Sequence, residues 1–147
     1  MRVYFDLCAI QRPMDDSSQL RVRLEAEAVL TLLELCDSGI LEMVVSAAHQ
    51  IENRQNPDLD RRSHTEKILA TARHRAVVSR NVASLAGAFV EAGLTRLDAL
   101  HLAAAVDSGT SYFCTTDDAL TRRGRRLNIA PTQIVTPIEL ALILNQK

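Results

Sequence analysis

The sequence has 147 residues, of which 47% are hydrophobic and 24% charged, as is typical of a globular protein with a sizeable core. With 17 basic and 18 acidic residues, the net charge of −1 excludes nucleic-acid binding through bulk charge, so any such site must be a local basic patch. The three scattered cysteines argue against a disulfide framework and against a zinc site.

Strand-like and helix-like segments alternate along the chain. Segments rich in β-branched or aromatic residues are the predicted strands: residues 2–6, 41–46, 76–79, 111–116 and 133–136. Helical periodicity and end signals predict helices at residues 18–38, 47–53, 58–74, 80–93, 95–109, 118–127 and 137–144. This alternation predicts an α/β fold with a central, mainly parallel β-sheet flanked by helices on both faces.

The chain shows no domain boundary and no membrane-directed segment. No linker, repeat or low-complexity tract divides it, so residues 1–147 are expected to form a single domain. The N-terminus enters a strand at once, without a signal peptide, and no apolar run reaches membrane-spanning length. We therefore expect a cytoplasmic protein that does not associate with membranes.

Capping and stop residues mark the helix ends. Ser17 or Ser18 is predicted to cap the first long helix and Gly39 to end it. Ser46 is expected to cap the next helix in the same way. Apolar residues at helical spacing define the expected buried face of the first long helix: Leu20, Leu24, Ala28, Leu32 and Leu35.

Four acidic residues lie where elements of a parallel sheet would converge. Asp6 ends the first strand and Asp117 follows the strand at residues 111–116, so both belong to the sheet edge where α/β proteins bind ligands. Glu52 lies beyond the second strand, and Asp98 begins the helix that leads into residues 111–116. Each has a structural alternative: a turn for Asp6, a solvated helix position for Glu52, a capping box for Asp98, and a helix cap for Asp117.

Converging carboxylates would repel one another. Two unit charges about 5 Å apart cost roughly 3 kcal/mol at an effective dielectric constant near 20. A divalent cation such as Mg²⁺ removes this repulsion, because it binds carboxylate oxygens and waters. Such a site can activate water and stabilise charge on a phosphoryl group, so the four acids predict a metal-dependent phosphodiesterase centre.

Four segments together resemble the PIN-domain family, including its VapC-type toxin ribonucleases, over essentially the whole chain. They are VYFDLCAI at 3–10, IEN at 51–53, TRLDALHLAAA at 95–105 and FCTTDDAL at 113–120. The resemblance implies a PIN-like fold and Mg²⁺- or Mn²⁺-dependent cleavage of RNA. It also implies a toxin of a type II toxin–antitoxin pair, with a small antitoxin protein as partner, and a homodimer, as in many members.

The resemblance assigns roles to the acids. Asp6, Asp98 and Asp117 hold the metal directly or through water, and Glu52 helps to orient a water molecule. Asp118 beside Asp117 leaves the fourth acid ambiguous by one position.

Three positions depart from the family pattern. Leu7 and Cys8 stand where hydroxyl or amide residues are frequent, and Leu120 replaces a frequent aromatic residue. Hydroxyl and amide groups can support a metal's ligands, so their loss puts the catalytic rate and the metal affinity in question. An alternative function therefore stays open: a PIN fold of weak or no activity that binds RNA or a protein.

Candidate RNA contacts are basic or polar residues near the predicted crevice. Arg12, close in sequence to Asp6, and Arg122, beyond the last acid, could bind phosphates, although solvated positions are the alternative. Asn53 could contact substrate beside Glu52, with a helix-end role as its alternative.

Two histidines lie near the acids in sequence. His101, one turn after Asp98, could be a metal ligand or a general base, and His49 precedes Glu52 by one turn. For both, a histidine bonded to a backbone carbonyl is the favoured interpretation.

Overall fold

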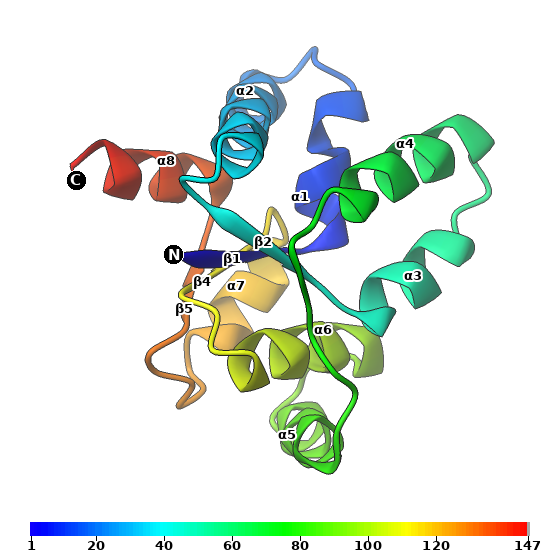
Figure 1. Ribbon diagram of the computed structural model, residues 1–147, viewed down its shortest axis with the longest axis vertical. Helices are drawn as coiled ribbons and strands as arrows, with labels where there is room; N and C mark the ends of the chain where they lie inside the picture. The colour runs from blue at the N-terminus through cyan, green and yellow to red at the C-terminus, as the bar shows by residue number, and fades with distance from the viewer. Residues whose placement is uncertain (147) are drawn as a thin grey trace.

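The computed structural model describes residues 1–146 (Figure 1). Within them one five-stranded sheet has the order β3-β2-β1-β4-β5, and every neighbouring pair is parallel. The strands are β1 (Arg2–Phe5), β2 (Glu42–Val45), β3 (His74–Arg75), β4 (Tyr112–Cys114) and β5 (Gln133–Val135). The predicted α/β fold with a mainly parallel sheet is confirmed.

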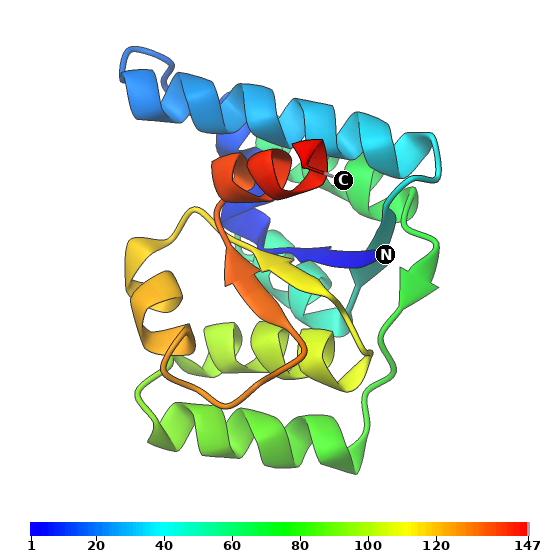
Figure 2. The ribbon, with the colours of Figure 1, turned by 90° about the vertical axis from the view of Figure 1, so that its left-hand side faces the viewer.

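Helices cover both faces of this sheet. They are α1 (Leu7–Gln11), the 3₁₀ helix η1 (Arg12–Met14), α2 (Leu20–Asp37), α3 (Ala47–Arg54), α4 (Leu59–Ala70), α5 (Arg80–Glu91), α6 (Arg96–Asp107), α7 (Asp118–Gly124) and α8 (Pro137–Asn145). Figure 2 shows α2 and α8 on one side of the sheet and α5 and α6 on the other. Among residues 1–146, no helix combines the length and the apolar character needed to cross a membrane.

Side chains on the two faces of β1 pack in two separate hydrophobic clusters. Val3 and Phe5 pack in the cluster that includes Leu32 of α2. Tyr4, which lies between them, packs in the opposite cluster with Leu102 of α6. Because strand side chains alternate between faces and both faces are covered, β1 is a continuous buried run.

The region around α1 and α2 differs from the prediction. Leu7–Gln11 forms a short helix that the sequence did not predict, since five residues show too little periodicity. The predicted Ser17 or Ser18 cap is wrong: α2 begins after Gln19, and the Ser18 hydroxyl donates to Asp16 instead.

The predicted face of α2 is partly wrong. Leu20 and Leu24 are 68% and 46% exposed, whereas Leu32 is buried as expected. The buried face is Val22, Glu25, Val29, Leu32 and Cys36. The helix carries more than one apolar stripe, and the packing of η1 and α8 against it decides which one is buried.

The third strand lies earlier than predicted. The pairing register joins Val44 to His74 and Val45 to Arg75, so β3 ends where the predicted strand 76–79 begins. Val77 and Val78 are exposed. Their β-branched side chains favour extended structure, but the position of the sheet edge decides which residues pair.

The order of the strands places a topological switch point at the end of β1. The chain passes from β1 to β2 on one side and later places β4 on the other side of β1. The Asp6 N–H donates to the carbonyl of Cys114 at 2.8 Å and so extends this ladder past the end of β1. Ligand crevices of α/β sheets lie at such switch points, beyond the carboxyl ends of the strands.

Candidate metal centre

Asp6 lies at the carboxyl end of β1 and caps α1. Its Oδ1 accepts the Leu7 N–H at 2.9 Å, and its Oδ2 accepts the Thr115 hydroxyl at 2.8 Å and the Cys8 thiol at 3.2 Å. Burial raises the pKa of Asp6, whereas nearby His101 and the Thr115 hydroxyl act in the opposite direction. Asp6 therefore has a structural role at the turn into α1. The three donors occupy three of roughly four lone-pair positions of its carboxylate and leave about one for another ligand.

Helices α3 and α6 bring Glu52 and His101 beside Asp6. His101 Nε2 lies 2.7 Å from Glu52 Oε1, with the His101 side chain buried and the Glu52 side chain 32% exposed. One carboxylate oxygen of Asp6, one of Glu52 and a ring nitrogen of His101 all lie within 4.8 Å of one another. This spacing suits a shared cation, so the three residues could bind a metal ion.

The two candidate histidines have different partners. His49 Nε2 lies 2.7 Å from the carbonyl oxygen of Phe5, and burial lowers the pKa of His49 to about 3, which keeps the ring neutral. For His49 the predicted backbone bond is confirmed. His101 instead has its Nδ1 2.6 Å from the Tyr4 hydroxyl and its Nε2 against Glu52, so the prediction of a backbone carbonyl partner is wrong for His101.

Asp98 lies in the first turn of α6, where the Thr95 hydroxyl accepts its N–H at 3.2 Å. Burial raises the pKa of Asp98, and the carboxylates of Asp6 and Asp117 raise it further. Asp98 is not part of the group within 4.8 Å. Its charge interaction with Asp6 nevertheless links Asp98 to the same end of β1.

The two adjacent acids after β4 are distinguished by their partners. Asp117 caps α7, with its Oδ1 accepting the Leu120 N–H at 3.0 Å. Asp118 receives two hydrogen bonds from Arg21, at 2.7 and 2.9 Å, and this pair lowers the pKa of Asp118. Asp118 is engaged by Arg21, whereas the charge of Asp117 contributes to the raised pKa of Asp98. Both side chains are exposed, and neither belongs to the group within 4.8 Å.

The predicted phosphate-binding arginines lie in different settings. The Arg12 guanidinium is 2.9 Å from Glu25, a buried carboxylate, and also 2.9 Å from Asp15. A phosphate contact by Arg12 would require these ion pairs to open. Arg122 is exposed in the last turn of α7 and is accessible to a ligand.

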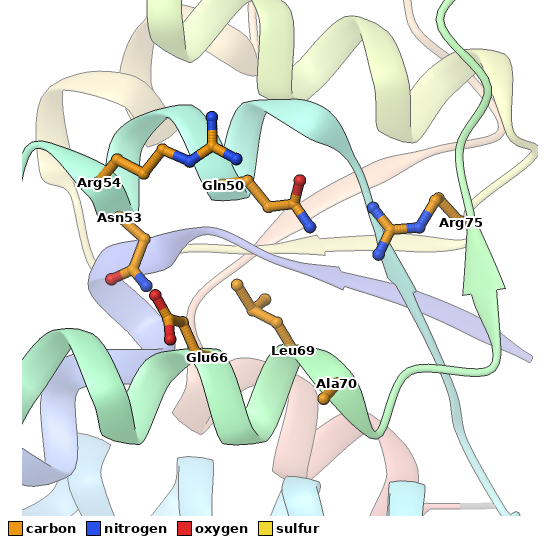
Figure 3. A pocket seen from close by; sticks show the side chains of 7 residues that line it. All are labelled: Gln50, Asn53, Arg54, Glu66, Leu69, Ala70 and Arg75. Atoms are coloured by element: carbon orange, nitrogen blue, oxygen red, sulfur yellow. The ribbon is translucent and has the colours of Figure 1, made fainter.

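Asn53 faces away from the acids. Its Nδ2 donates to the carbonyl of Arg62 on α4 at 3.1 Å, whereas the neighbouring Glu52 faces α6. Its buried Oδ1 has no hydrogen-bond partner within residues 1–146. The side chain borders a cavity of about 240 Å³ between α3 and α4, lined by Gln50, Asn53, Arg54, Glu66, Leu69, Ala70 and Arg75 (Figure 3). The structure therefore does not bring the Asn53 side chain to the predicted acids.

Two residues of the centre were not predicted from the sequence. The hydroxyl of Thr115 donates to Asp6 across the β1–β4 junction, and the hydroxyl of Tyr4 bonds His101 across 97 positions of sequence. Both residues lie on strands or just beyond them. Their side-chain partners depend on how neighbouring strands pair, which the local sequence does not show. A hydroxyl within an apolar strand is a weak indicator of such a role.

Comparison with known proteins bears on the fold. No family model matches the sequence, and no curated protein matches it. Among solved structures the chain is similar to the protein described as "Crystal structure of PAE2754 from Pyrobaculum aerophilum", with a TM-score of 0.54, 18% identity and coverage of 100% of both chains. At this identity the likeness shows a shared α/β fold, and the parallel sheet is consistent with the PIN-like fold expected from the sequence.

Proposed function

We propose that the protein is a metal-dependent endoribonuclease of the PIN type. The observation that carries the proposal is the convergence of Asp6, Glu52 and His101 within 4.8 Å at the end of β1. Asp98 adds a further carboxylate, whose pKa is raised by burial and then by the charge of Asp6. Asp6 is buried, and Glu52 and Asp98 are half-buried. Carboxylates this close together are costly unless a cation or protons neutralise them, and a cation that binds carboxylates suits phosphodiester hydrolysis.

The residues take distinct roles in this proposal. Asp6, Asp98 and Asp117 would hold Mg²⁺ or Mn²⁺ directly or through water, and Glu52 would orient the attacking water. A bound cation would supply charge stabilisation for the phosphoryl oxygens. Exposed Arg122 positions the RNA backbone without reading its sequence.

The biological role we propose is that of the toxin of a type II toxin–antitoxin pair acting on cytoplasmic RNA. A small antitoxin protein would neutralise it by covering the acidic crevice. The exposed Leu24 and Leu142, which border one groove between α2 and α8, offer an apolar surface for a homodimer.

RNA cleavage is the direct test of the enzyme. We expect single-stranded or structured RNA to be cut with Mn²⁺ or Mg²⁺ and left intact with EDTA. Asp6→Asn and Asp98→Asn are expected to lower the rate roughly 100-fold or more, because even groups that only support metal ligands contribute 10–100-fold. Gel analysis of end-labelled RNA measures these rates.

The adjacent acids provide a matched control. Asp117→Asn should slow cleavage strongly, whereas Asp118→Asn, which removes only the exposed pair with Arg21, should change the rate less than about threefold. Cleavage that persists in EDTA, or in Asp6→Asn, would show that the activity does not belong to this centre.

A second candidate function is RNA or protein binding without cleavage. This alternative is favoured by the three hydrogen bonds that Asp6 accepts, one of them from Cys8. They leave few lone pairs of the carboxylate free to bind a metal. Retention of RNA on a filter, without cutting in any metal and unchanged by Asp98→Asn, would support this alternative over the nuclease.

A further inference from the structure

His101 is held at both ring nitrogens by side chains. Its Nδ1 lies 2.6 Å from the Tyr4 hydroxyl, which in turn lies 2.7 Å from the Ser46 hydroxyl. The Ser46 oxygen also accepts the Ala48 N–H and so is fixed at the start of α3. The other nitrogen, Nε2, faces Glu52.

This chain of hydrogen bonds is compatible with a proton on Nδ1. In that tautomer the Nδ1–H donates to the Tyr4 oxygen, and the Tyr4 O–H donates to Ser46. The Nε2 lone pair is then directed toward the carboxylates of Glu52 and Asp6, and its 2.7 Å approach to Glu52 is favourable only when both bind a cation. Without a cation the proton lies on Nε2, which donates to Glu52, and the Tyr4 O–H donates to Nδ1. Histidines that bind metals characteristically donate their other ring N–H to a fixed partner, which sets the tautomer and the ring orientation.

We propose that His101 Nε2 is a direct ligand of the metal, together with Asp6 and with Glu52, whose carboxylate then binds the metal as well as orienting the water. This nitrogen makes the centre prefer transition-metal ions such as Mn²⁺ and Co²⁺ to Mg²⁺. The inference rests on the proposed metal centre and adds a donor that the four acids do not include. Mg²⁺ favours oxygen ligands and loses its waters reluctantly, whereas imidazole suits first-row transition ions.

Burial and charge agree with this assignment. His101 is buried and Asp6 is 4% exposed, while the Glu52 side chain is 32% exposed and keeps the group in contact with solvent. A neutral imidazole adds a third donor without adding a third buried negative charge. Tyr4 is a positioning residue, because it touches the ring of His101 and not the metal.

A spectroscopic experiment on the unmodified protein tests the ligand directly. Mn²⁺ is bound to protein labelled with ¹⁵N-histidine and to unlabelled protein, and electron spin-echo modulation is recorded. We expect strong nitrogen modulation that changes with the isotope. In His101→Gln it should disappear, whereas in His64→Gln, which alters an exposed histidine of α4, it should persist.

The outcomes separate this inference from the proposed function. Bound Mn²⁺ without histidine nitrogen modulation in the wild-type protein would overturn the role of His101 and leave the carboxylate centre standing. Absence of Mn²⁺ binding would overturn both. Because the wild-type spectrum decides the question, misfolding of the buried His101→Gln variant does not obscure it.

Calorimetric affinities test the metal preference and the role of Tyr4. In the wild-type protein the Kd for Mn²⁺ is expected to be at least about tenfold below that for Mg²⁺. Tyr4→Phe should weaken Mn²⁺ binding about 10–100-fold, since it removes the partner that orients the ring. Tyr112→Phe, a hydroxyl deletion in the neighbouring strand β4, is the matched control and should bind as wild type. Equal affinity for the two ions, or no effect of Tyr4→Phe, would refute the proposal.

Discussion

At the scale of single residues, two histidines packed around one tyrosine have different roles. The rings of His49 and His101 lie 4.4 and 5.6 Å from the ring of Tyr4. His49 bonds the backbone at both nitrogens and is structural, while His101 bonds only side chains and faces two carboxylates. The nature of the hydrogen-bond partners, rather than burial, separates a core histidine from a candidate ligand.

The buried His49 predicts a specific acid sensitivity. Burial lowers its pKa from 6.5 to about 3, so between these pH values the ring binds a proton in the unfolded chain but not in the folded protein. The stability that depends on neutral His49 is present in full above pH 6.5 and is lost as the pH falls toward 3. Between pH 8 and pH 5 we expect about 2 kcal/mol of the free energy of unfolding to disappear through this residue.

Urea unfolding at the two pH values measures this loss. His49→Gln, which has no titrating ring, should be less stable at pH 8 but should lose about 2 kcal/mol less than the wild type on acidification. An identical pH dependence in the two proteins would show that His49 does not resist protonation.

At the scale of elements, capping chemistry locates helix starts well. Ser46 and Thr95 cap α3 and α6, and Asp117 caps α7, as the sequence indicates. Which face of a helix is buried depends on distant segments. In α2 it is the apolar stripe that packs against η1 and α8. The end of α7 shows the same dependence: Gly124 is buried against Ile134 of β5.

Two glycines in helices predict opposite effects of the same substitution. A Cβ at Gly124 would overlap the Cδ1 atom of Ile134, so the buried isoleucine must change its rotamer. We expect Gly124→Ala to destabilise the protein by about 1–2 kcal/mol. Gly87, within α5, has open space at this position, and Gly87→Ala should stabilise by about 0.5–1 kcal/mol through helix propensity.

Thermal or urea unfolding of both variants checks this contrast. Stabilisation by both substitutions would mean that helix propensity outweighs the contact with β5. In that case the packing of α7 against the sheet would be looser than the structure indicates.

At the scale of the whole molecule, the candidate metal centre joins distant parts of the chain. Asp6 follows β1, Glu52 lies on α3, and His101 and Asp98 lie on α6. A cation bound among them links segments that separate completely on unfolding, so its binding free energy contributes to global stability.

This linkage predicts metal-dependent stability. At a free Mn²⁺ concentration 100-fold above its Kd, the free energy of unfolding should rise by about 2.7 kcal/mol. Asp6→Asn should abolish the increase, whereas Asp118→Asn should retain it. Urea unfolding with Mn²⁺ and with EDTA measures the difference, and an equal gain in Asp6→Asn would place the ion elsewhere.

The sequence by itself determined the fold class, most helix starts and the position of the acids at the ends of strands. These features depend on periodicity, caps and strand ends, which act over a few residues. Only the tertiary structure decided that His101 meets Glu52 across 49 positions, that Asn53 turns toward α4, and that Glu25 engages Arg12. Such contacts depend on strand order, register and helix rotation, which arise when distant segments pack together and leave no local trace in the sequence.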